Sequence, residues 1–136
     1  MNPDLEATYR CDPGVVGPAR RWAYEMLCSR LPVGDVLDDA VLVVSELVTN
    51  AIRAECSQIS IRIAVEADAV LIGVVDDATG SPRQEDVSTT AAAGRGLKIV
   101  AAVSRQWGVR PRRGDGHAGK EVWARLSLDG RPSQLS

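Results

Sequence analysis

The chain has 136 residues, enough for one domain with its own core, and 45% of the residues are hydrophobic although none is Phe. Its net charge of −2 gives no basic excess, so a nucleic-acid-binding surface is not indicated, and no apolar run is long enough to cross a bilayer. A single His and three widely spaced cysteines, Cys11, Cys28 and Cys56, argue against a structural zinc site. We expect free thiols, no signal peptide and a cytoplasmic protein.

The first part of the chain is predicted to form a short strand around Tyr9 and then two helices. The first helix is predicted from about Val16 to Leu31, where Pro32 to Gly34 ends it. The second, Asp35 to Ala54, has no internal Gly or Pro, and Asp35 is predicted to cap its N-terminus. Its apolar residues recur at helical spacing and form one stripe: Leu37, Val41, Val44, Val48 and Ala51.

Strands dominate the second half of the chain. Ile59 to Val65 alternates apolar and polar residues, as a half-buried strand does, whereas Val70 to Val75 is almost wholly apolar and is predicted to lie centrally in a sheet. Gly80 to Gly94 is a loop long enough to indicate a functional segment. The remaining predicted elements are a helix over Leu97–Val103 and strands over Trp107–Arg110 and Glu121–Leu128.

This order of elements predicts an α/β (α+β) two-layer sandwich, with helices covering one face of a mixed, mostly antiparallel sheet. The domain is expected to span residues 9–128, with flexible tails at 1–8 and 129–136. The one cationic cluster, Arg110 to Arg113, contains Pro111 and is interpreted as a solvated strand end or loop.

Glu46 and Asn50 are the most informative pair of residues. They lie four residues apart, so they share a face of the second helix, roughly opposite its apolar stripe. Aliphatic residues nevertheless flank that face, and a carboxylate among aliphatic side chains needs a partner. A bound Mg²⁺ ion with nucleotide phosphates would supply one. The alternative is a polar surface pair on an amphipathic helix.

Three later motifs bear on this choice. Asp76-Asp77-Ala78-Thr79-Gly80 follows a buried strand, where a carboxylate could accept a hydrogen bond from the exocyclic amine of adenine; an Asp-rich turn is the alternative. Gly94-Arg95-Gly96-Leu97 opens a helix, whose N-terminal amides attract phosphate, although a plain turn is also common. Gly119-Lys120 enters the last strand, with Lys120 either over phosphates or in water.

In this order the motifs resemble the Bergerat ATP-binding fold of gyrase-type ATPases, ninety-kilodalton heat-shock chaperones, sensor histidine kinases and MutL proteins. Four segments of the sequence are similar to those of a stand-alone actinomycete branch, the anti-sigma-factor-type serine/threonine kinases: SELVTNAIRA, VVDDATGSPR, GRGLKIV and GKEVWARL. The resemblance covers roughly Tyr9 to Leu128.

The resemblance implies a role for each motif. Asn50 would coordinate Mg²⁺, Glu46 would be the general base, and Asp76 would hold the adenine amine. The other nucleotide contacts would come from Gly80, Gly94, Arg95, Gly96, Leu97 and Lys120, with Gly80 to Gly94 as the ATP lid. The chain departs from the family pattern at Ala78, where the usual motif has glycine, and at Lys120, where wider family members often have threonine.

The expected function is therefore an ATP- and Mg²⁺-dependent protein kinase that phosphorylates an anti-sigma-factor antagonist and binds a sigma factor, as a partner switch in transcription control. A homodimer is possible, and neither nucleic acid nor membrane is expected as a direct partner. One alternative is a binding module that holds ATP and a protein partner without transferring phosphate. Two weaker alternatives are a histidine-kinase catalytic fragment and an unrelated α/β domain.

Overall fold

A computed structural model describes residues 4–77, 91–114 and 117–128 of the protein. The elements of this part of the chain follow in the order β1 (Leu5–Arg10), the short 3-10 helix η1 (Pro13–Val15), α1 (Val16–Leu27), α2 (Asp35–Arg53), β2 (Gln58–Val65), β3 (Ala69–Asp76), α4 (Ala91–Val103), β4 (Gln106–Gly114) and β5 (His117–Ser127).

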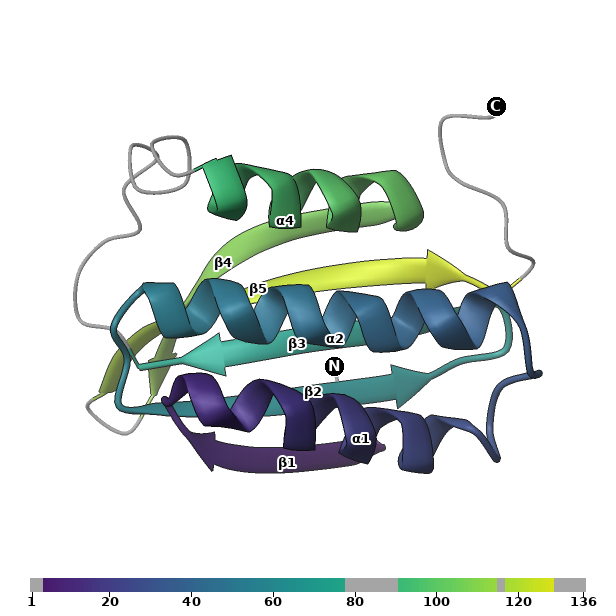
Figure 1. The fold of residues 1–136 in the computed structure, drawn as a ribbon, viewed down its shortest axis with the longest axis horizontal. Helices are drawn as coiled ribbons and strands as arrows, with labels where there is room; N and C mark the ends of the chain where they lie inside the picture. Colours follow the sequence, from purple (N-terminus) through teal and green to yellow (C-terminus); the bar gives the residue numbers. More distant parts are fainter. Residues whose placement is uncertain (1–3, 78–90, 115–116, 129–136) are drawn as a thin grey trace.

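The strands form one antiparallel sheet in the order β1-β2-β3-β5-β4. The helices α1, α2 and α4 lie over one face of this sheet, which confirms the predicted two-layer α/β architecture (Figure 1). The nearly all-apolar strand β3 lies at the centre, as predicted, because it has neighbours on both edges and helices above it. The sheet was expected to be mostly antiparallel, and each strand pair of the described sheet is antiparallel.

Helix α2 forms the middle of the helical layer. It packs against α1 on one side, α4 on the other, and β3 and β5 beneath. The predicted stripe faces the core, but Val43 and Leu47 are fully buried as well, since the helix has neighbours on three sides. The face that carries Glu46 and Asn50 is consequently half-buried instead of solvent-exposed.

Several element boundaries differ from the predictions. Helix α1 ends at Leu27, four residues early, because the chain turns there and brings Leu31 into the core. Gly34, with φ of 141°, caps α2 in place of Asp35, which is the first helical residue. Strand β1 begins at Leu5, so residues 5–8 belong to the sheet and not to a tail. The tail 129–136 lies outside the described residues.

The second half of the chain contains longer elements than its sequence pattern predicts. Strands β4 and β5 pair from Gln106–Arg125 to Gly114–His117, well beyond the predicted apolar segments. Pro111 is tolerated within β4 because this strand lies at the edge of the sheet. Helix α4 begins at Ala91 and not at Leu97, so it includes the Gly94-Arg95-Gly96 segment.

The expectation of three free thiols is wrong for two of them. Cys11, just after β1, and Cys56, just before β2, form a disulfide, with their Cα atoms 5.6 Å apart. Their wide separation in sequence hides this pairing, which arises because β1 and β2 are antiparallel neighbours and bring both residues to one end of the sheet. Cys28 is an exposed free thiol.

Candidate functional site

The predicted motifs come together at one end of the sheet. The C-terminal half of α2, the end of β3 and the starts of α4 and β5 all lie at the left of the molecule in Figure 1. The antiparallel topology explains the convergence: α2 leads into β2 at this end, β3 returns to it, and β5 starts from it. Residues far apart in sequence thus surround one region.

Glu46 on α2 points toward α4. A Cβ atom added at Gly96 would lie 2.9 Å from Oε2 of Glu46, so the carboxylate rests almost against the backbone of α4. Gly96 is buried, and only a residue without a side chain leaves the carboxylate this position. Asn50 follows one turn later on the same face of α2 and is also half-buried. The structure therefore brings the Glu46–Asn50 motif of α2 into contact with the Gly94-Arg95-Gly96 motif of α4.

Asp76 and Lys120 form a buried ion pair. The two residues are opposite each other in the β3–β5 register, and Lys120 Nζ donates to Asp76 Oδ2 at 2.8 Å. Their side chains are 0% and 9% exposed, so both charges are removed from bulk water. The interpretation of Lys120 as a residue over phosphates or in water did not anticipate this carboxylate partner, which follows from strand register and not from any local pattern.

Gly119 explains the other half of the Gly119-Lys120 motif. A Cβ atom at this position would lie 2.2 Å from the backbone carbonyl oxygen of Asp76, so β5 can approach the end of β3 only if residue 119 is glycine. The close approach sets the register that brings Lys120 to the Asp76 carboxylate. Gly119 is therefore required by the close packing of β5 on β3.

Asp77 is a residue whose role sequence reasoning missed. Its Oδ1 accepts hydrogen bonds from the backbone N–H groups of Ser57, at 2.8 Å, and Gln58, at 3.1 Å, while its Oδ2 accepts one from the Ser57 hydroxyl. Burial alone raises the pKa of Asp77, but these hydrogen bonds outweigh it and keep the pKa below its ordinary value of 3.8. Asp77 thus fixes the start of β2 beside Asp76.

The other predicted nucleotide contacts belong to the strand-end motif after β3 and to α4. Gly80 and Ala78 lie outside the described residues, as does most of the predicted lid. Gly94 and Arg95 lie in the early turns of α4, which begins at Ala91. Beyond the first turn of a helix, backbone N–H groups already donate to carbonyl groups of the same helix. Leu97 is partly buried and packs against the core, which anchors α4 close to α2.

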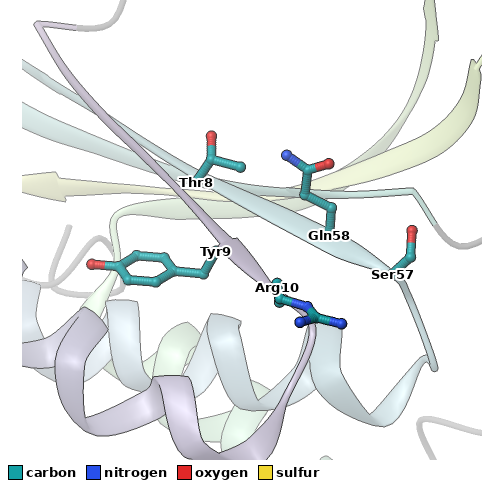
Figure 2. A pocket seen from close by; sticks show the side chains of 5 residues that line it. All are labelled: Thr8, Tyr9, Arg10, Ser57 and Gln58. Atoms are coloured by element: carbon teal, nitrogen blue, oxygen red, sulfur yellow. The ribbon is translucent and has the colours of Figure 1, made fainter.

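A shallow pocket adjoins this end of the sheet at the β1–β2 edge (Figure 2). Five residues line it: Thr8, Tyr9, Arg10, Ser57 and Gln58. In Figure 2 Tyr9 points toward the helices, whereas Thr8 and Gln58 lie on the other side of the strands. None of the five belongs to the predicted nucleotide-binding set. Two of them, Ser57 and Gln58, donate hydrogen bonds to Asp77, the residue after Asp76.

The described residues contain no group of three or more His, Cys, Asp or Glu side chains placed to hold a metal ion. Nor, within the same ranges, does any helix have the length and apolar content needed to span a bilayer.

Comparison with known protein families matches residues 35–130 to the family described as "Histidine kinase-, DNA gyrase B-, and HSP90-like ATPase". The match includes α2, the central strand β3, α4 and the β4–β5 hairpin, and so covers most of the chain. A search of curated proteins found no match. The chain belongs to the histidine kinase-, DNA gyrase B- and HSP90-like ATPases.

Proposed function

We propose that this ATP-binding protein is a serine/threonine protein kinase of the anti-sigma-factor type. It would use Mg·ATP to phosphorylate a hydroxyl of an anti-sigma-factor antagonist in the cytoplasm, and would also bind a sigma factor directly, as a partner switch. Family membership supports the use of ATP. The resemblance of the four motifs to the stand-alone kinase branch supports the choice of partner and acceptor.

The position of Glu46 is the observation that carries the proposal. Its carboxylate lies against Gly96 at the α2–α4 contact, one turn before Asn50. A carboxylate held at the edge of a nucleotide site could accept the proton of an attacking hydroxyl.

The side chains at this end of the sheet fit Mg·ATP. Mg²⁺ prefers oxygen ligands and keeps several waters, so one amide oxygen from Asn50 together with phosphate oxygens would hold it without a cluster of acidic residues. The ion would neutralise charge on the phosphates during transfer.

Asp76 would recognise the adenine amine, and Lys120 would assist it. A carboxylate has about four lone-pair sites, so the contact from Lys120 to Oδ2 does not by itself prevent a hydrogen bond from adenine. The ammonium also compensates the buried negative charge of Asp76, which would otherwise be costly inside the domain. We therefore assign Lys120 to Asp76 and not to the phosphates.

The proposal is tested by incubating the purified protein with labelled ATP, Mg²⁺ and candidate antagonist proteins from the same genome. Wild type should transfer phosphate, and Glu46→Gln should bind ATP within a few-fold of wild type but transfer almost none. Glu25→Gln, which changes an exposed glutamate of α1, is the matched control and should behave as wild type. Binding of Mg·ATP and a sigma factor without any transfer by wild type would instead support the non-catalytic binding module.

A further inference from the structure

The face of the sheet opposite the helices carries a group of polar side chains on β4 and β5. In the β4–β5 register Arg110 is opposite Glu121, and Gly108 is opposite Trp123. Val122 and Ala124 face the helical core, so their neighbours Glu121 and Trp123 face the open side. Figure 1 shows the three helices on the other face only.

Glu121 is 1% exposed although it lies on this open face. A Cβ atom at Gly73 would lie 2.2 Å from Oε2 of Glu121, so the carboxylate lies flat over the β3 glycine. Its Oε2 is 3.7 Å from Nη1 of Arg62 and has no hydrogen-bond partner within the described part of the chain. Its Oε1 is shared by Arg110, at 3.4 Å, and Arg112, at 3.7 Å.

These distances leave the two β4 arginines with unused binding capacity. A charge-assisted hydrogen bond between guanidinium and carboxylate is about 2.7–2.9 Å long, so both contacts are ion pairs without a closed hydrogen bond. Arg110 and Arg112 have side chains that are 48% and 45% exposed, and each guanidinium carries five N–H donors. Glu121 therefore holds them in place without saturating them.

The excess positive charge is local to the β4 edge, where Arg110 and Arg112 share a single carboxylate oxygen. Other arginines of this face have acidic neighbours along β1 and the β2–β3 turn: Arg62–Glu6 at 3.9 Å, Arg125–Glu66 at 3.2 Å and Arg125–Asp68 at 3.5 Å. We call Arg110, Arg112 and Trp123 the β4 arginine patch.

We propose that the β4 arginine patch docks an acidic segment of a partner protein. Aspartate or glutamate side chains would accept the guanidinium hydrogen bonds that Glu121 leaves unmade, and would relieve the repulsion between two like charges held side by side. Because the patch lies on the open sheet face and the ATP motifs lie at the helical side, this docking does not depend on phosphoryl transfer.

A single-stranded nucleic acid is the competing anionic partner, and the geometry of Trp123 argues against it. Nucleic acid binding to open sheets relies on bases stacked on free aromatic rings. A Cβ atom at Gly108 would lie 3.0 Å from the Trp123 ring, and the guanidinium carbon of Arg110 lies 5.1 Å from the ring centroid. The ring thus already has neighbours where a base would stack.

The test measures binding of a labelled oligoglutamate peptide to the full chain by fluorescence anisotropy. Wild type should bind it, more weakly as salt is raised, and Arg110→Gln/Arg112→Gln should weaken binding by about ten-fold or more, since the double variant removes both charged donors of the patch. The matched control is Arg20→Gln/Arg21→Gln, which removes the same charge from exposed positions of α1 and should bind like wild type.

A second measurement needs no variant with altered arginines. In the nitrogen–proton spectrum of wild type, the peptide should shift the indole signal of Trp123 and leave that of Trp22, on α1, in place. Three results would overturn the proposal: no peptide binding, equal weakening in both double variants, or tighter patch-dependent binding of labelled oligothymidylate. A wild-type dimer that Arg110→Gln/Arg112→Gln dissociates would also overturn it, because a second copy would then cover the patch.

Discussion

Gly96→Ala should lower the rate of phosphoryl transfer and, at the same time, raise the free energy of unfolding. The added Cβ atom would lie 2.9 Å from Oε2 of Glu46, whereas ordinary contacts begin at 3.4 Å. The carboxylate must therefore retreat by about 0.5 Å, which a flexible side chain can do at little cost to the fold. The backbone of α4, in contrast, exchanges a flexible glycine for the best helix former.

The two effects have different sizes and opposite signs. A misplacement of about 1 Å in a catalytic group costs roughly 10²-fold, so a shift of half that size should reduce phosphoryl transfer on the order of ten-fold. Replacing an interior helical glycine by alanine should raise the free energy of unfolding by about 0.5–1 kcal/mol. Urea denaturation measures the second quantity, and single-turnover transfer from labelled ATP measures the first.

Gly17→Ala is the matched control, because α1 offers open space around that position. This variant should leave the transfer rate unchanged, and any gain in stability should resemble that of Gly96→Ala. An unchanged transfer rate in Gly96→Ala would refute the assignment of Glu46 as the base. A loss of ATP affinity with normal transfer from bound ATP would show that Gly96 serves nucleotide binding alone.

Three further changes test the packing around the site. Lys120→Met should lower the free energy of unfolding by about 3–5 kcal/mol in urea denaturation, because it leaves the buried carboxylate of Asp76 without its cation, and a loss below 1 kcal/mol would contradict a buried ion pair. Asp77→Asn should lower the free energy of unfolding at neutral pH, and this difference from wild type should vanish as the pH falls below 3.8 and through the lowered pKa of Asp77. A difference in the free energy of unfolding that persists in acid would assign the loss to the shape of the side chain and not to its charge. Dithiothreitol should reduce the stability of wild type by up to about 4 kcal/mol, as expected for a bridge across 45 residues, and should not affect Cys11→Ser.

Local pattern was sufficient to predict the elements whose periodicity is strong. Helix α2 has an uninterrupted apolar stripe, and β3 is apolar on both faces, so each was predicted in type and position, with β3 at the centre of the sheet. Short-range spacing also placed Glu46 and Asn50 on one helical face. The order of the motifs indicated the family, which the comparison then confirmed independently.

Boundaries were less predictable because they depend on contacts with distant residues. The four-residue error at the end of α1 and the early start of α4 both fall where the local sequence permits either a helix or a turn. The pairing partner decides the length of β4 and β5, since polar residues at their ends lack an apolar pattern but still complete the ladder.

Contacts between residues far apart in sequence were decided by tertiary structure alone. Strand register places Lys120 on Asp76, the antiparallel β1–β2 pair joins Cys11 to Cys56, and the packing of α4 on α2 sets Gly96 against Glu46. A sequence specifies which residue types can form such contacts, because propensity and periodicity act over a few residues. Which residues come into contact is decided only when the strands pair in one register and the helices pack on the sheet, since those steps involve residues that are far apart along the chain.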